Sequence, residues 1–482
     1  MNQLYIKKRD INLFGVLSII VIASYAITAF FTKGMNNASK FDIYALGYLI
    51  DALFVFSLVI FKKVENNKFS LISLLLIINF TFNFGQISLW TLGIHAVNEI
   101  GTGNLYSNFP RPTDFQIFQG ELYSFKCFCM LILGLSITTF LNKNHYQNRQ
   151  KYDPEIIRNI IYKISIIVGI IIIPLTFVKI VITIIQSAKF GYLSLYYSDF
   201  SIASIISRSE DYFFPVIVGL LIGSNYKKIK PVYIIFALYT VLYIVAGERG
   251  NWVYKLLILF WMHTRYYKPI KWKSFFKILL IGIVADYNLG IVVDTRSYGL
   301  SNITGQQVRD SLTSSNPLTR FIFEMGNSLG ITIIVLTIGR QPFAQLGNTY
   351  LSAFLASFSS KLADLFNINY VYLASYLTSN ILKTGYGTGF TFFAETYVNT
   401  GNFGYFLMIL FGIVGGLVLK DSNDPSLKDP FRVYLACISC AICCSMVRDS
   451  ALGGFRQFVQ VVLFMYIVIR IFYDLYYRRS RQ

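Results

Sequence analysis

Apolar runs long enough to cross a lipid bilayer recur along almost all of this 482-residue chain. Hydrophobic residues make up 55% of it and charged residues only 14%, and the mean hydropathy is +0.53. A soluble domain does not need so much apolar surface, whereas a bilayer core about 30 Å thick is spanned by a helix of about 20 apolar residues. The sequence therefore predicts an all-α polytopic membrane protein. It shows no internal repeat or linker, so residues 1–482 are expected to form a single membrane domain.

Hydropathy predicts about twelve transmembrane helices, of which the sixth and the eighth are short. They cover residues 11–31, 43–61, 70–92, 121–141, 159–186, 212–224, 231–247, 251–264, 275–294, 403–419, 431–447 and 457–475. The first run follows Lys7, Lys8 and Arg9 and is too long for the core of a cleaved signal peptide, so it is expected to remain as a span.

The net charge of +19 lies mostly in the short connections between these spans. Basic connections, such as Lys227–Lys230 and Arg265–Lys277, alternate with less basic ones along the chain. An excess of Lys and Arg marks the cytoplasmic side of a membrane protein. Both termini are therefore predicted to be cytoplasmic, and the charge indicates membrane topology rather than a nucleic-acid partner.

The stretch from Asp294 to Asn402 departs from this alternation of spans and short connections. Its two apolar pieces, Gly330–Thr337 and Tyr350–Phe358, are too short to cross a bilayer and suit helices at the interface or in a protein-lined cavity. Residues 295–402 are therefore predicted to form a large outward-facing loop of short helices. A membrane protein with so much chain on one side is expected to carry out its chemistry there.

The outward connections carry mainly arginine, which opposes the topology rule and so needs another explanation. These residues are Arg111, Arg208, Arg249, Arg296, Arg309, Arg320, Arg340, Arg448 and Arg456. A guanidinium group presents a fork of donors that fits phosphate oxygens and keeps its charge when partly buried. We expect Arg111, Arg208 and Arg309 to pair with nearby acids. Pairing and anion binding both remain open for the four that lie next to predicted span ends: Arg249, Arg296, Arg448 and Arg456.

The tight turn Gly247–Gly250 is the first candidate site, because its Glu248 and Arg249 are costly at membrane depth unless they pair or face a wet cavity. Lys255 follows about two helical turns later, so a helix would bring it toward the same cavity. The alternative is a structural ion pair that holds the hairpin together.

Two further segments carry charge at the predicted outer face. Arg448, Asp449 and Ser450 begin the connection between the last two spans, with glycines and Arg456 behind them. Glu395 is the only acid in the last thirty residues of the long stretch. It is a candidate general base, or else it interacts with the N-terminus of its own helix.

Several kinds of chemistry lack their usual residues. Among the three histidines only His95 is predicted to face outward, and the outward acids lack the spacing of metal ligands. Phosphate-binding and dinucleotide-binding glycine motifs are absent as well. The four cysteines of Cys437–Cys444 have no histidine near them and are interpreted as packing residues. The sequence therefore predicts neither a metal site nor a cofactor.

The order of these features resembles a known family. The chain is similar to the bacterial O-antigen polymerases of the Wzy type in three features that occur in the same order. They are a span that ends in Gly247-Glu-Arg-Gly250, a large outward loop, and the run Glu395–Gly404 that enters a later span. The resemblance lies in architecture and order, and it covers the whole chain. It implies a GT-C-like fold related to that of O-antigen ligases. The ligases are associated with an outward catalytic histidine that this long loop lacks, so either a carboxylate takes that role or catalysis differs.

The resemblance also implies an activity and a location. The activity is transfer of a growing glycan from undecaprenyl diphosphate to another lipid-linked repeat unit, without metal or nucleotide. The location is the bacterial inner membrane, with the long loop and active site in the periplasm and a chain-length regulator in the same membrane as a partner. In this setting Arg249, Arg296, Arg448, Arg456 and Lys255 are candidate diphosphate ligands, and Glu248 or Glu395 is the candidate catalytic carboxylate.

A lipid-linked oligosaccharide flippase or another polysaccharide transporter is the alternative function. Such a protein is expected to carry charges through the middle of several spans and often a repeated half. This sequence concentrates its charges on one face and shows no repeat, which favours the enzyme. A purely structural membrane scaffold is a third and weaker possibility.

Overall fold

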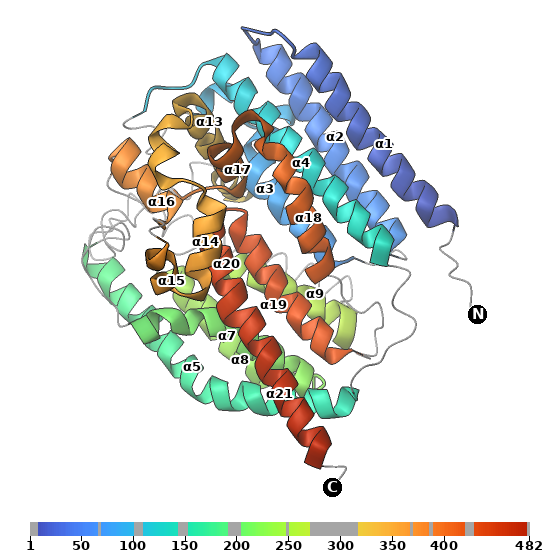
Figure 1. Cartoon of the computed structure of the whole chain (residues 1–482), viewed down its shortest axis with the longest axis vertical. Helices are drawn as coiled ribbons and strands as arrows, with labels where there is room; N and C mark the ends of the chain where they lie inside the picture. The colour runs from blue at the N-terminus through green and yellow to red at the C-terminus, as the bar shows by residue number, and fades with distance from the viewer. Residues whose placement is uncertain are drawn as a thin grey trace. The chain divides into compact units, whose positions relative to one another are not determined.

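In the computed structural model the described chain is entirely helical (Figure 1). The described residues are 8–65, 69–100, 109–142, 153–190, 204–246, 250–269, 317–366, 370–384, 389–419 and 429–479, and no β-strand occurs among them. Contacts between residues divide the chain into two compact units. Unit 1 comprises Met1–Arg149, Ile322–Asp421 and Ile442–Arg456, and unit 2 comprises Gln150–Phe321, Ser422–Ala441 and Gln457–Gln482. The expectation of a single membrane domain stays a prediction.

Seven helical segments of the described chain are long and apolar enough to cross a membrane. They are Lys40–Val64, Leu71–Thr91, Asp114–Thr138, Pro154–Lys189, Leu318–Ile338, Phe392–Val418 and Ala451–Tyr476. Gly15–Phe31, Ile229–Val245 and Pro430–Met446 are shorter apolar helices. These findings confirm a polytopic α-helical membrane protein. The predicted span 275–294 lies outside the described residues, so the count of about twelve stays a prediction.

One segment of spanning length lies inside the predicted outward loop. Helix α12 (Pro317–Met325) leads into α13 (Ser328–Ile338), and together they provide the 21-residue segment Leu318–Ile338. The expectation that the long stretch holds no such segment is therefore wrong. The sequence pattern was misleading because Arg320 and Glu324 interrupt its apolar run. Helix α14 (Thr349–Phe358), with 10 residues, is too short to cross.

Two other helical runs begin earlier than predicted. The run that contains the predicted span 403–419 begins at Phe392, and the run that contains 457–475 begins at Ala451. The first consists of α17 (Phe392–Thr400), the 3-10 helix η7 (Gly401–Phe406) and α18 (Leu407–Val418). The second consists of α20 (Ala451–Gln457), the π-helix η8 (Phe458–Leu463) and α21 (Phe464–Arg479). Glu395 and Arg456 therefore lie within helical runs rather than in connections.

Unit 1 is built around α3 (Leu71–Thr91) and α4 (Asp114–Asn142). In each of these helices 78% of the spanning window is buried, so both lie in the interior of the unit. Helices α1 (Lys8–Phe31) and α2 (Lys40–Val64) pack side by side against α4, and α13 and α18 also contact it (Figure 1). Gly134 and Gly412 permit close approach of α4 and α18, because a Cβ on Gly134 would lie 2.2 Å from the Ile409 carbonyl oxygen.

The short elements of unit 1 are η1 (Val97–Glu99), η5 (Gln341–Leu346), α14, α15 (Ser360–Leu365), α16 (Leu373–Tyr376) and the π-helix η6 (Leu377–Leu382). Three of them, η5, α16 and η6, share an apolar core with α13 and α17. The core includes Ile334, Phe343, Leu377, Phe390 and Val398, all nearly inaccessible to solvent. Packing against this core, rather than helix length, holds these short elements in place.

Unit 2 contains α5 (Pro154–Phe190), α7 (Ser204–Gly223), α8 (Ile229–Val245), α9 (Gly250–Met262) and the π-helix η3 (His263–Tyr267). Helix α19 (Pro430–Met446) passes from unit 2 into unit 1. Helix α5 packs along α7, and only 22% of its spanning window is buried, which suits a helix that faces lipid. It is visibly curved in Figure 1, and Pro174 within it removes one backbone hydrogen bond.

Candidate active site

Glu395 on α17 is buried in unit 1, with 1% of its surface exposed. Its Oε1 accepts a hydrogen bond of 2.7 Å from the Thr349 hydroxyl on α14, and its Oε2 accepts one of 2.6 Å from the backbone N–H of Ala451 on α20. One carboxyl group thus joins three helices that are far apart in the sequence. Glu395 lies in the first turn of α17, so the predicted interaction with the N-terminus of its own helix stays a prediction, while its hydrogen bonds go to the first residues of two other helices.

Asn399 completes this junction from the next turn of α17. Its Nδ2 donates to Thr349 Oγ1 at 2.8 Å and to the Glu395 carbonyl at 2.9 Å. Its Oδ1 accepts the backbone N–H of Thr349 at 2.8 Å. The start of α14 is therefore fixed to α17 by both side chains.

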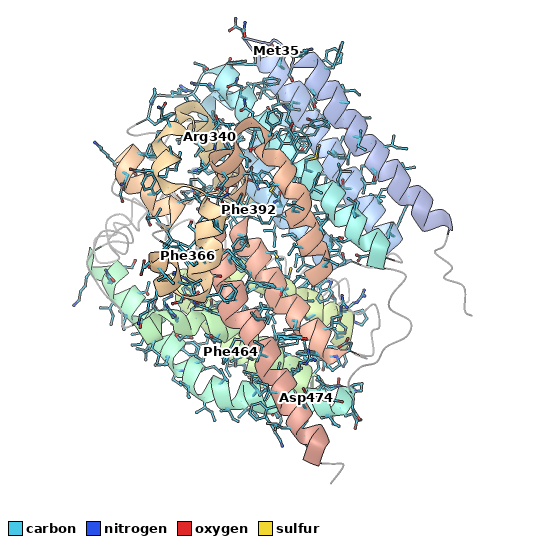
Figure 2. All side chains as sticks on the ribbon, in the orientation of Figure 1. Met35, Arg340, Phe366, Phe392, Phe464 and Asp474 are labelled. Atoms are coloured by element: carbon cyan, nitrogen blue, oxygen red, sulfur yellow. The ribbon has the colours of Figure 1, made fainter. Side chains whose placement is uncertain are left out.

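Arg340, labelled in Figure 2, closes the C-terminal end of α17. Its guanidinium donates from Nε to the Val398 carbonyl at 3.1 Å and from Nη2 to the Asn399 carbonyl at 2.9 Å. A cation is favourable at a helix C-terminus, where carbonyl groups lack partners. The next residue after α17, Gly401, has a φ of 68° and lies against Arg340, which explains a glycine there. This outward arginine stabilises the fold.

The turn that follows α17 packs tightly on α4. The Tyr123 hydroxyl on α4 lies 2.7 Å from Thr396 Oγ1. A Cβ on Gly404 would lie 2.2 Å from the Thr396 carbonyl oxygen and 2.5 Å from the Tyr123 hydroxyl. Backbone conformation at Gly401 and close packing at Gly404 therefore explain why glycines occur at these two positions.

Arg448 and Asp449 lie immediately before α20, whose first N–H binds Glu395. Arg448 is exposed, and its Cζ is 5.9 Å from the centre of the Phe82 ring. Asp449 Oδ1 accepts the backbone N–H of Ser450 at 2.7 Å. Burial raises the pKa of Asp449 to about 6, although the hydrogen bonds from Ser450 act in the opposite direction. Asp449 also interacts electrostatically with Glu395.

Arg456 lies in the last turn of α20. Its Nη1 donates to the Tyr372 hydroxyl at 2.9 Å, and its Cζ is 5.8 Å from the centre of the same ring. Its Nε is buried and has no hydrogen-bond partner among the described residues. Neither Arg448 nor Arg456 forms an ion pair with an acid in the part of the chain that the structure describes. Both guanidinium groups are therefore available to bind an anion.

The two carboxyl groups of this cluster suit different tasks. Both oxygens of Glu395 accept hydrogen bonds from the protein, and the side chain is closed to solvent. Asp449 is only partly buried, and a pKa of about 6 is close to the value that suits a general base near neutral pH. The cluster can therefore hold an anionic group on arginine and accept a proton on Asp449.

Lys255 lies elsewhere, in unit 2. Its Nζ is 3.7 Å from Glu210 Oε1 and 3.1 Å from the Tyr239 hydroxyl, and Lys179 lies 2.5 Å from the other oxygen of Glu210. Its charge is thus balanced within the protein, although its predicted role as a phosphate ligand is not tested. Glu248, Arg249 and Arg296 lie outside the described residues, so their roles also stay predictions.

The remaining candidates have structural partners. His95 Nδ1 lies 2.5 Å from Glu99 Oε2, and its ring stacks on Phe323 at 4.6 Å. Within the described ranges no group of three or more His, Cys, Asp or Glu side chains is arranged to hold a metal ion. Five of the six free cysteines are buried and Cys443 is partly exposed.

Sequence reasoning did not single out Asp449 as a candidate base and treated it only as a partner for arginine. The motif Arg448–Ser450 drew attention to this turn, but it does not reveal that Asp449 is partly buried and forms no ion pair with a described cation. Thr349 and Asn399 gave no signal at all, because their importance comes from contacts across about fifty residues of sequence.

Fold and composition define the class of this protein as a polytopic α-helical membrane protein. Its sequence matches the model of the O-antigen polysaccharide polymerase Wzy family over residues 11–480, and the chain belongs to that family. The predicted resemblance is thereby confirmed. Membership implies polymerisation of lipid-linked repeat units by glycosyl transfer, and it assigns the chain to the multi-pass membrane proteins of the bacterial O-antigen pathway. No curated protein and no solved structure matches the chain.

Proposed function

We propose that this polymerase transfers a glycan from undecaprenyl diphosphate to the non-reducing end of a second lipid-linked repeat unit, at the periplasmic face and without a metal ion. The observation that carries the site assignment is a pair of guanidinium groups that have no acid partner among the described residues. Arg448 lies beside Asp449 just before α20, and Arg456 lies in the last turn of α20. A diphosphate leaving group concentrates negative charge, and forked arginine donors fit its oxygens.

The chemical step is a single displacement at the anomeric carbon. The bond from this carbon to the diphosphate oxygen breaks while a bond to the acceptor hydroxyl oxygen forms. The diphosphate leaves with the bonding electron pair, and Arg448 and Arg456 stabilise its developing charge. Asp449 accepts the proton of the acceptor hydroxyl. Displacement from the opposite side inverts the configuration of the sugar.

Within this proposal Glu395 is a positioning residue rather than the base. Both of its oxygens are engaged, and its bond to the Ala451 N–H fixes the start of α20, two residues after Asp449. Glu248 remains the alternative base, and Arg249 and Arg296 remain additional diphosphate ligands, on the sequence argument alone. Lys255, paired with Glu210, is assigned a structural role.

The proposal also includes the finer features expected from the sequence. These are about twelve spans in a GT-C-like arrangement, both termini in the cytoplasm, residues 295–402 largely in the periplasm and a chain-length regulator as partner. If the segment Leu318–Ile338 crosses the membrane once, every later connection changes side. The later connections keep their predicted sides only if a second segment also crosses, or if Leu318–Ile338 enters and leaves the membrane on the same side.

Buried charges within membrane helices are the feature expected of the transporter alternative. Lys179, within the segment Pro154–Lys189, pairs with Glu210, and Asp51 on α2 accepts hydrogen bonds from Ser88 and Thr91. The charges are thus less confined to one face than the sequence indicates. The family assignment nevertheless favours polymerisation.

The decisive experiment incubates the purified protein in liposomes with undecaprenyl-diphosphate-linked repeat units and resolves the products on a gel. A ladder of polymers that persists in EDTA is expected, because arginine supplies the positive charge. Movement of the substrate across the bilayer without any ladder would support the transporter instead. A ladder lost in EDTA and restored by a divalent ion would overturn the metal-free mechanism.

A further inference from the structure

Unit 2 contains a cavity of about 430 Å³ that the proposed reaction does not use. It lies between α7 and the run formed by η8 and α21, and its lining includes Arg208, Asp211, Tyr212, Gln460, Phe464 and Ile467. Phe464 is labelled in Figure 2 at the start of α21. The volume falls in the usual range of small-molecule sites, about 300–1,000 Å³.

The α7 wall of the cavity is polar. Arg208, Asp211 and Tyr212 are spaced i, i+3 and i+4, so they lie on one face of the helix. Arg208 is exposed and forms no ion pair with an acid of the described chain, so the expected pairing stays a prediction. Asp211 Oδ1 accepts a hydrogen bond of 2.9 Å from Gln457 Nε2, and the Tyr212 hydroxyl donates to the Gln460 carbonyl at 2.7 Å.

The opposite wall is apolar and partly exposed. Leu463, Phe464 and Ile467 are 38%, 49% and 45% exposed, and they belong to the spanning segment Ala451–Tyr476. One charged end and one apolar end in the same cavity fit an amphiphile with a single anionic head group. A water-soluble sugar would leave the apolar wall uncovered.

The backbone is irregular on both walls. Pro215 has no N–H to donate to the Asp211 carbonyl, so α7 lacks one hydrogen bond at the polar end. The facing residues Phe458–Leu463 form a π-helix, a feature that occurs frequently at functional sites. Such irregularity is tolerated at membrane depth where the backbone lines a cavity.

We propose that this cavity binds one of the two lipid-linked substrates. The phosphate lies at Arg208, the polyprenyl chain runs along Phe464 and Ile467, and the first sugar donates hydroxyl hydrogen bonds to Asp211. The assignment rests on the proposed function, because it takes its ligand from that reaction. A polyprenyl diphosphate has one chain and fits one apolar wall, whereas a diacyl phospholipid brings two chains. The neutral hydroxyl groups of a sugar also match the carboxylate of Asp211, which can only accept hydrogen bonds when ionised.

The test measures binding rather than polymerisation. Full-length protein in nanodiscs is photolabelled with a benzophenone-bearing polyprenyl diphosphate sugar, and the labelled peptides are identified by mass spectrometry. We expect label within residues 458–467, displaced by undecaprenyl diphosphate but not by phosphatidylglycerol. Arg208→Gln should weaken binding about tenfold, equivalent to about 1.4 kcal/mol, and Ile467→Trp should block labelling by filling the apolar end.

Ile167→Trp is the matched control, because Ile167 is 64% exposed on the lipid-facing helix α5 of the same unit and does not line the cavity. It should label normally, and gel filtration shows whether each variant is folded. Label outside 458–467, or equal displacement by phosphatidylglycerol, would overturn the proposal. If the protein makes polymer but is not labelled within residues 458–467, only the proposed binding site is contradicted. If it is labelled within these residues but makes no polymer, only the proposed function is contradicted.

Discussion

Glu395 offers the sharpest test of whether a buried carboxyl group in this family positions the site or performs the chemistry. In Glu395→Gln the new carbonyl oxygen can still accept the Ala451 N–H, and the new amide can donate to Thr349 Oγ1. The Thr349 hydroxyl hydrogen then has no acceptor, because the amide NH2 that replaces Oε1 can only donate. The loss is about one hydrogen bond, or about 1–2 kcal/mol of unfolding free energy.

Glu395→Ala removes both acceptors and leaves a cavity. The Ala451 N–H and the Thr349 hydroxyl each lose a partner at about 1–3 kcal/mol, and the cavity adds further cost. We therefore expect a loss of about 3–6 kcal/mol, several times that of Glu395→Gln. Thermal unfolding in detergent measures the ranking, and Thr349→Val combined with Glu395→Gln tests whether the two effects couple, as contacting residues should.

The polymerisation assay separates the two roles. If Glu395 only positions α20, Glu395→Gln keeps its rate within about tenfold of the parent. Asp449→Asn, the same carboxyl-to-amide change, instead loses about 10²–10⁴-fold, as expected when a general base is removed. If Glu395→Gln keeps its thermal stability but loses about 10²–10⁴-fold in polymerisation rate, Glu395 is the general base and not a positioning residue.

Three further predictions can be checked with the same membranes. Arg448→Lys and Arg456→Lys should lose most polymer at matched protein level, because one ammonium does not replace a forked guanidinium; normal ladders from both would place the diphosphate elsewhere. The rate should rise with pH through about 6 as Asp449 loses its proton, and Asp449→Asn should abolish this rise; an identical pH profile in the variant would exclude Asp449 as the base. Single cysteines placed in Lys227–Lys230 should react only with reagents that reach the cytoplasm, and labelling from the periplasm would reverse the topology.

The sequence located most of the membrane helices because burial in lipid imposes a simple local requirement, about 20 apolar residues in succession. Where polar residues interrupt the apolar run, hydropathy no longer identifies the membrane helix. Arg320 and Glu324 concealed the segment Leu318–Ile338 in this way. The start of the run Phe392–Val418 was missed for a related reason, since its first turns are held by packing on α4 and α13 and carry polar side chains.

The candidate site was only partly accessible to sequence reasoning. The motif around Arg448 drew attention to a turn that leads into α20, because arginine on the predicted outer side opposes the topology rule. Arg340 carried the same signal but binds the end of α17, and only its contacts distinguish the two residues. Glu395 was recognised as unusual, although its role depends on Thr349 and Ala451, which no spacing rule connects to it.

By itself the sequence determined the class, the family resemblance and the approximate helices, because each follows from hydropathy, charge and order along the chain. Tertiary structure decided which charges are satisfied within the protein. It paired Lys255 with Glu210, used Arg340 to end a helix and occupied both oxygens of Glu395, whereas no described acid pairs with Arg448 or Arg456. The physical reason is that the free energy of a charge inside a membrane protein depends on its neighbours in space and its access to water. Neither the spatial neighbours of a charged residue nor its access to water can be read from the residues beside it in the sequence.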